Sequence, residues 1–210
     1  MKKICIIGIA CLATVMFVPH QAMAATSHAD VIAAAFAPYT VAAPNPDRVM
    51  VCHGFGCRLR TDVELTGADR AQLAHIMAQG KASPAAERRA VAVAGAWFDR
   101  RVAEAAGTHG HVARAGASYM FDNDGQFDCI DSSRNMTTLL LLLDDLHLLR
   151  YHHPDIPVAR GYIIDFRLPH ATAVLTDNTT GQSWAVDSWT RAYGQSPEIM
   201  SLSRWEAGPY

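Results

Sequence analysis

Three side chains of the types used in thiol catalysis occur in the second half of the sequence: Cys129, His170 and Asp187. A thiol nucleophile needs a base that takes its proton and later returns one to the leaving group. That base in turn needs a third group that fixes its orientation. The sequence therefore predicts Cys129 as nucleophile, His170 as general base and Asp187 as the group that orients the base.

Cys129 is expected to be the first residue of a helix. Asp128 and Asp131 have the spacing of an N-cap residue and its reciprocal partner, so both are interpreted as structural helix caps. The helix N-terminus favours a thiolate, whereas the two aspartates oppose it by charge repulsion, so a cationic histidine nearby would be needed. The alternative is that Cys129 is only a small buried apolar residue.

The helix that starts at Cys129 should be central in the fold. Five consecutive leucines, Leu139 to Leu143, make it apolar nearly all round, which is typical of a helix covered on several sides. His152 and His153 are expected at its C-terminal end, because the helix dipole favours cations there and Pro154 cannot continue the helix.

Two segments with strand character surround a connection rich in turn-forming residues, 177–181. With residues 177–180 as the loop, Thr176 pairs with Gly181 and His170 lies directly opposite Asp187. Direct cross-strand partners share a face of the sheet, so the carboxylate could hold the imidazole. A register shift of one residue would put the two side chains on opposite faces.

The N-terminal residues predict a secretory signal peptide, residues 1–24. Lys2 and Lys3 precede an apolar run, 4–18, and Ala22-Met23-Ala24 has the small residues of a cleavage site. Acylation at Cys11 is the alternative interpretation. Because no later segment resembles a membrane span, we expect export across the inner membrane to the periplasm without a stable span.

Removal of this segment would leave 186 of the 210 residues and, with the loss of two lysines, change the formal net charge from −2 to −4. A mildly acidic surface argues against a nucleic-acid partner. Three cysteines would remain, an odd number for an oxidising compartment. Cys52 and Cys57 enclose two glycines and form the natural disulfide, which leaves Cys129 as the free thiol.

Residues 25–106 predict a mostly helical N-terminal lobe that contains the short disulfide loop. Capping and breaking residues indicate the elements, which are helices at 27–38, from Thr66 to about 79 and from Ser83 to Gly107, with an exposed strand at 58–65. In the longest helix, Trp97 and Phe98 are interpreted as core residues rather than as a platform for substrate.

No cofactor or metal is predicted. Residues 122–125 resemble the middle of a calcium loop only faintly, because position 120 is a methionine and the pattern would end on Asp131 instead of glutamate. A solvated turn is the preferred interpretation. The histidines, which include His109 and His111, lack the cysteines or carboxylates at a spacing that would complete a metal site.

Residues 125–191 resemble the core of the transglutaminase-like superfamily. The matching motifs are Cys129-Ile130-Asp131, Pro169-His170-Ala171 and Trp184-Ala185-Val186-Asp187-Ser188-Trp189. They also resemble bacterial transglutaminase-like cysteine proteinases, which are periplasmic peptidases. The sequence departs from the pattern at Ser132-Ser133, where relatives often carry Ala or Tyr. The resemblance implies a papain-like α+β fold in 107–210, with the central helix packed on an antiparallel sheet.

The resemblance further implies a periplasmic thiol hydrolase that cleaves a peptide or isopeptide amide through an acyl-thioester on Cys129. Its substrate would be a protein or peptide of the cell envelope. By position, the backbone amide of Cys129 and the side chain of Gln126 would form the oxyanion hole, although Gln126 also fits as an ordinary loop residue. Two alternatives stay open: acyl transfer to an amine, and a catalytically silent domain that binds a peptide or envelope partner.

Overall fold

The computed structural model describes residues 27–116, 123–161 and 169–208. The predicted signal peptide lies outside these ranges, as does Asp122 of the calcium-like turn. The helices are α1 (His28–Phe36), α2 (Gly67–Ala78), α3 (Pro84–Ala106), α4 (Cys129–Asp145) and α5 (Leu202–Ala207), with a short 3-10 helix, η1 (Ala37–Tyr39), after α1. The strands are β1 (Arg48–His53), β2 (Leu59–Glu64), β3 (His152–Arg160), β4 (His170–Asp177), β5 (Ser183–Asp187) and β6 (Glu198–Ser201).

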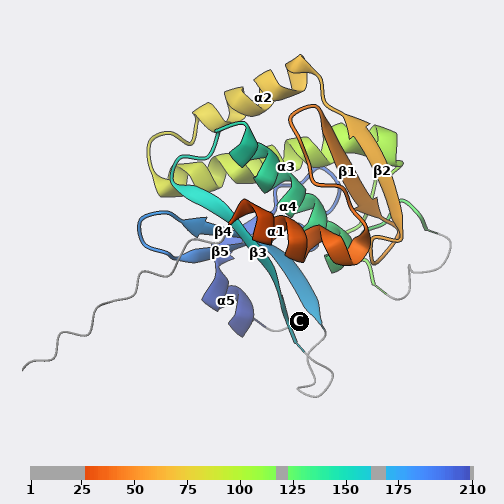
Figure 1. Ribbon diagram of the computed structural model, residues 1–210. Helices are drawn as coiled ribbons and strands as arrows, with labels where there is room; N and C mark the ends of the chain where they lie inside the picture. The colour runs from red at the N-terminus through yellow and green to blue at the C-terminus, as the bar shows by residue number, and fades with distance from the viewer. Residues whose placement is uncertain (1–26, 117–122, 162–168, 209–210) are drawn as a thin grey trace, which may run out of the picture.

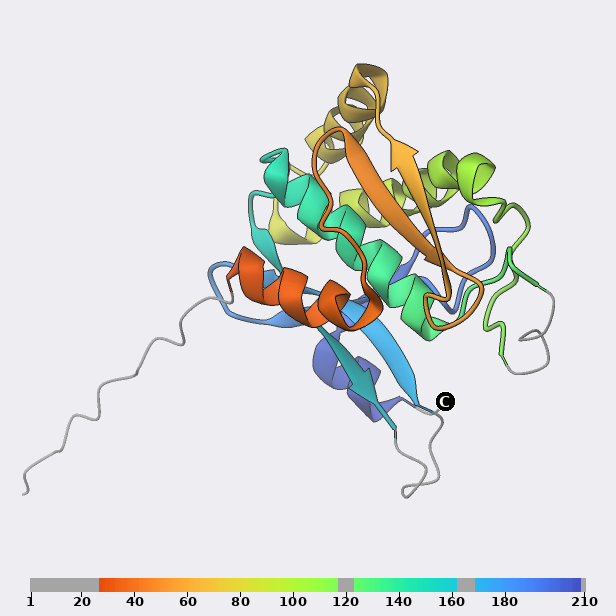
Figure 2. The ribbon, with the colours of Figure 1, turned by 45° about the vertical axis from the view of Figure 1, so that its right-hand side comes forward.

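The fold is a mixed α+β fold with two antiparallel sheets, which confirms the predicted class at this level. One sheet is the β1–β2 hairpin, and the other has the strand order β3-β4-β5-β6. Helix α4 packs against β1 on one side and against β3 and β4 on the other, so it lies between the two sheets (Figure 1). Helix α5 lies on the opposite side of the larger sheet from α4, as Figure 2 also shows.

Helix α4 begins as predicted. The carboxylate of Asp128 accepts the N–H of Asp131, and that of Asp131 accepts the N–H of Asp128, which confirms the capping box and Cys129 as the first helical residue. The five leucines are at most 1 % exposed: four of them pack with residues of β1, β4 and β5, and Leu141 packs with residues of α1, which confirms the central position of the helix. No helix in the described ranges has the length and apolar character needed to cross a bilayer.

The helices of the N-terminal part also begin where capping residues indicate. Thr66 caps α2 and Ser83 caps α3, while α3 ends at Gly107 in the left-handed region, with φ of 67°. Phe98 is buried, and the half-buried Trp97 packs against the same core, which confirms both as packing residues.

The predicted position of His152 and His153 at the end of α4 is wrong. The helix ends at Asp145, and both histidines begin β3. His147 takes a left-handed conformation with φ of 54°, and the N–H of Leu148 returns to the carbonyl of Leu143 at 2.8 Å. This hydrogen bond is typical of a Schellman motif at the end of a helix. Such a motif is usually recognised in a sequence by its glycine, but here the left-handed residue is a histidine.

The predicted register of the β4–β5 hairpin is also wrong, by two residues. Thr176 pairs with Ser183 rather than with Gly181. Gly181 belongs to the turn instead: its φ is 68°, its N–H bonds the carbonyl of Asp177, and the Asp177 carboxylate accepts two further N–H groups of the loop. A register shift of two residues leaves each side chain on the same face of the sheet. His170 and Asp187 therefore stay on one face, offset along the strands.

Candidate functional site

His170 and Asp187 are joined by a hydrogen bond in the protein interior. Nε2 of His170 lies 2.6 Å from Oδ2 of Asp187, and the two side chains are 1 % and 2 % exposed. Two more N–H groups reach the same carboxylate, the indole Nε1 of Trp205 at 2.9 Å and the backbone N of Trp189 at 3.2 Å. A proton on Nε2 that faces the carboxylate makes Nδ1 the basic nitrogen of the neutral ring.

The imidazole of His170 is packed between two indoles. Its centroid lies 4.7 Å from the ring of Trp189 and 5.3 Å from that of Trp205. Trp189 is held in turn by the bond from its Nε1 to the carbonyl of Ala115, at 3.0 Å. Sequence reasoning missed Trp205, because it lies in a six-residue C-terminal helix with no motif around it.

Cys129 is half-buried at the start of α4 and reaches the beginning of β4. Its Sγ lies 4.0 Å from the carbonyl oxygen of Pro169, and the backbone N–H of Ala171 also acts on it. These two groups belong to the residues on either side of His170. The structure thus joins His170 to Asp187 and places the Cys129 sulfur against the backbone on both sides of His170.

Burial raises the pKa of the Cys129 thiol to about 11. The negative charges of Asp128 and Asp187 raise it further, whereas the N–H groups of Ala171 and of Cys129 itself lower it. The features of a helix N-terminus that favour a thiolate are therefore outweighed. The resting form of the candidate nucleophile at neutral pH is the protonated thiol.

Gln126, the candidate oxyanion donor, is buried two residues before the N-cap of α4. Its Oε1 accepts the backbone N–H of Val112 at 2.9 Å, and its carbonyl accepts the N–H of Gly54 at 3.0 Å. This hydrogen bond therefore fixes the orientation of the side-chain amide group of Gln126. A role of its NH2 group in an oxyanion hole stays a prediction.

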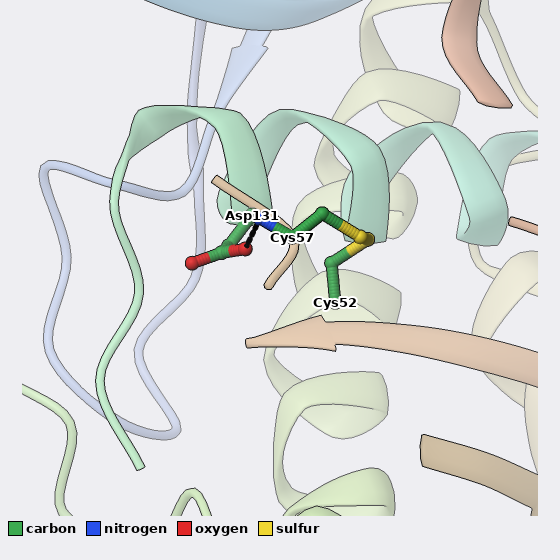
Figure 3. A group of neighbouring side chains, drawn as sticks. All are labelled: Cys52, Cys57 and Asp131. Carbon is green, nitrogen blue, oxygen red and sulfur yellow. Dashed lines mark hydrogen bonds between the residues drawn. A yellow bond between two sulfur atoms is a disulfide. The ribbon is translucent and has the colours of Figure 1, made fainter. Parts of the chain in front are cut away.

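Cys52 and Cys57 form the predicted disulfide, and Cys129 is the free cysteine of the described chain. The disulfide lies against the buried carboxylate of Asp131 (Figure 3). Burial and the charge of Asp128 raise the pKa of Asp131 to about 8, while N–H groups of Cys57, Asp128 and Phe55 lower it.

Within the described ranges, one group of three potential metal ligands lies within 4.8 Å: Cys52, Cys57 and Asp131. Both sulfurs are used in the disulfide, so neither is a thiolate that could bind a metal ion. In the calcium-like turn, the Asp124 carboxylate pairs with Arg58 at 2.6 Å. His111, one of the histidines considered for metal, bonds Asp99 through Nε2 at 3.0 Å.

No protein-family model matches this chain, and neither a curated protein nor a solved structure matches it. The assignment of a function therefore depends on the residues and their geometry.

Proposed function

We propose that this protein is a periplasmic thiol hydrolase of the transglutaminase-like, papain-like type, which cleaves a peptide or isopeptide amide through an acyl-thioester on Cys129. The observation that carries the proposal is the buried 2.6 Å bond between His170 and Asp187 with the only free thiol of the described chain beside it. The papain-like arrangement is supported by the order of these residues in the chain. Cys129 begins a helix, His170 begins the strand β4, and Asp187 ends the next strand, β5.

The protonated state of the thiol determines the first step. The side chain of Cys129 turns from the Pro169 carbonyl toward His170, and Nδ1 takes the Sγ proton as sulfur attacks the carbonyl carbon of the substrate. Asp187 stabilises the imidazolium that forms. The position of the thiol against the residues that flank His170 supports this approach.

The charge that develops on the substrate oxygen needs N–H donors. The backbone N–H of Cys129 is one, because the first N–H groups of a helix have no acceptor within the helix. Gln126 would supply the second from its side chain. The imidazolium of His170 then gives its proton to the departing amine, which leaves an acyl-thioester on Cys129. His170 next removes a proton from water, and the resulting attack releases the acid and restores the thiol.

The proposed compartment is the periplasm, and the proposed substrate is an envelope protein or peptide. The N-terminal pattern of residues 1–24 would direct export, and a bond such as Cys52–Cys57 persists in oxidising compartments.

A catalytically silent binding domain is the second candidate, and two observations favour it. Burial raises the pKa of the Cys129 thiol, and His170 is almost inaccessible. Transfer of the acyl group to an amine is a variant of the first candidate, since it shares the acyl-thioester and differs only in the group that resolves it.

Fluorescein-labelled casein with monodansylcadaverine as added amine separates these functions. A hydrolase releases labelled peptides, an acyltransferase attaches the dansyl amine to casein, and a binding domain does neither. Cys129→Ala and His170→Ala should each abolish the reaction, although both variants keep the Cys52–Cys57 disulfide. Release that persists in Cys129→Ala would refute the proposed nucleophile.

A further inference from the structure

The disulfide loop has an unusual backbone. Four consecutive residues take positive φ: Gly54 at 74°, Phe55 at 70°, Gly56 at 65° and Cys57 at 56°. Phe55 and Cys57 are not glycines, so this conformation is unfavourable for them and needs support from their surroundings. The bond from Cys57 to Cys52 closes the loop at its end.

The support comes from the two aspartates on either side of Cys129. Phe55 and Cys57 donate their N–H groups to Oδ2 and Oδ1 of Asp131 at 2.8 and 2.6 Å, and Gly56 donates to Oδ2 of Asp128 at 2.8 Å. Three successive N–H groups of the loop thus bond to the first turn of α4. Figure 3 shows Asp131 reaching the backbone of Cys57 next to the sulfurs.

The other end of the loop is held by the same helix. Asn135, one turn beyond Asp131, accepts the N–H of Cys52 through Oδ1 and donates Nδ2 to the Cys52 carbonyl, both at 2.8 Å. The N–H of Gly54 bonds the carbonyl of Gln126, just before the helix. The loop is therefore bonded to α4 and to the chain that leads into it, on both sides of Cys129.

We propose that the Cys52–Cys57 loop is a positioning element for Cys129, with Asp131 as its positioning residue. The proposal rests on the nucleophilic role of Cys129 argued above. The disulfide keeps Phe55 and Cys57 in the conformation that directs their N–H groups at Asp131. Those N–H groups satisfy a carboxyl group that has no contact with solvent.

Opening of the disulfide has a defined consequence for the nucleophile. Phe55 and Cys57 can then leave the left-handed region, and Asp131 loses their two N–H donors and keeps that of Asp128. The first turn of α4 rearranges to hydrate that carboxyl group and carries Cys129 with it. Because burial is the largest cause of the raised thiol pKa, the pKa of Cys129 falls toward its ordinary value while the sulfur leaves the side of His170.

The test uses Cys52→Ala/Cys57→Ala and Asp131→Asn, with Glu87→Gln as matched control. Glu87 is likewise a buried carboxylate that accepts two backbone N–H groups of a distant loop, at 2.7 and 3.0 Å, but these donors, Arg150 and Tyr151, lie after the end of α4. The readouts are amide exchange over residues 129–133, the rate of Cys129 alkylation by iodoacetamide against pH, and release of peptides from casein.

In both test variants the backbone amides of residues 129–133 should exchange faster than in wild type. Alkylation of Cys129 at mildly alkaline pH should be on the order of tenfold faster or more. Their casein hydrolysis should fall at the same time. Glu87→Gln should lower thermal stability without either change in Cys129. Reduction of the folded wild type should reproduce the alkylation change, and reoxidation should reverse it.

If both variants lose stability as Glu87→Gln does, with unchanged exchange over 129–133 and an unchanged alkylation profile, the loop is a structural support only and the inference fails. Failure of the proposed function is recognised separately. In that case wild type does not cleave casein, while alkylation and exchange still report whether the loop controls Cys129.

Discussion

His170 and Asp187 are hydrogen-bonded through Nε2 and Oδ2 at 2.6 Å, although they are offset along the β4–β5 ladder rather than directly paired. The carboxylate accepts two further N–H groups, from Trp205 and Trp189. Three donors hold this buried carboxylate in place, and one of them is the imidazole nitrogen that it orients. The carboxylate thus determines which ring nitrogen, Nε2, faces the protein interior and which, Nδ1, is left for the proposed role as base.

Asp187→Asn should fold and lose most of its turnover. An asparagine presents an NH2 group where the carboxylate accepts a hydrogen bond, and it cannot stabilise an imidazolium. We expect kcat/KM for casein peptides to fall on the order of a hundredfold or more, which is roughly 3 kcal/mol of transition-state stabilisation. A near-normal rate combined with a lower melting temperature would show that Asp187 is only a structural residue at a strand end.

Trp205→Phe separates support of the site from catalysis. The variant removes the Nε1–H donor to Asp187 and keeps an aromatic ring beside His170. We expect the free energy of unfolding in urea to fall by about 1 kcal/mol and the hydrolysis rate to fall by less than about tenfold. A loss of rate as large as that of Asp187→Asn would show that the indole N–H is needed for turnover.

Glu87→Gln should reduce stability in a manner that depends on pH. Burial raises the pKa of Glu87, but hydrogen bonds from His152, Arg150 and Tyr151 outweigh it, so the pKa lies below 4.5. A lowered folded pKa contributes stability above the unfolded value, and this contribution is lost as pH falls through the folded value. The variant should be about 1–3 kcal/mol less stable at neutral pH.

Urea unfolding of wild type and Glu87→Gln, at neutral pH and in steps below pH 4.5, measures this dependence. The difference between the two proteins should shrink as the solution becomes more acidic. A difference that grows with acidity would contradict the lowered pKa.

Removal of calcium should leave stability unchanged. The Asp124 carboxylate is largely exposed and pairs with Arg58, and an exposed turn with few oxygen ligands is a poor site for calcium. Thermal melts with and without EDTA should coincide. A large drop in melting temperature with EDTA would show that the acidic turn binds a structural calcium ion.

Local sequence signals were sufficient to predict the helix starts and the disulfide. Thr66, Ser83 and Asp128 cap their helices through bonds within four residues, so the neighbouring sequence contains the whole interaction. The Cys52–Cys57 bond also spans a short segment. The pairing of His170 with Asp187 was predicted for the same reason, since both flank one hairpin and an error of two residues keeps the face.

Interactions between distant segments could not be predicted in this way. The bonds from Phe55 and Cys57 to Asp131 cross more than 70 residues, and Trp205 reaches Asp187 from a helix that lacks a motif. The end of α4 was missed because His147 takes a conformation that usually indicates glycine. The sequence left the protonation state of the Cys129 thiol open, because burial, the largest cause of its raised pKa, depends on the whole fold.

The most direct test of the central claim is acylation of the protein by 4-nitrophenyl acetate, which needs no knowledge of the natural substrate. Nitrophenolate release is followed in time, and peptide mass spectrometry locates the acetyl group. If His170 activates the protonated thiol, wild type should release a rapid burst of nitrophenolate and carry the acetyl group on Cys129. The burst should be on the order of a hundredfold slower in His170→Ala and absent in Cys129→Ala. Equal bursts in wild type and His170→Ala, or acetyl groups on lysines in place of Cys129, would contradict the account.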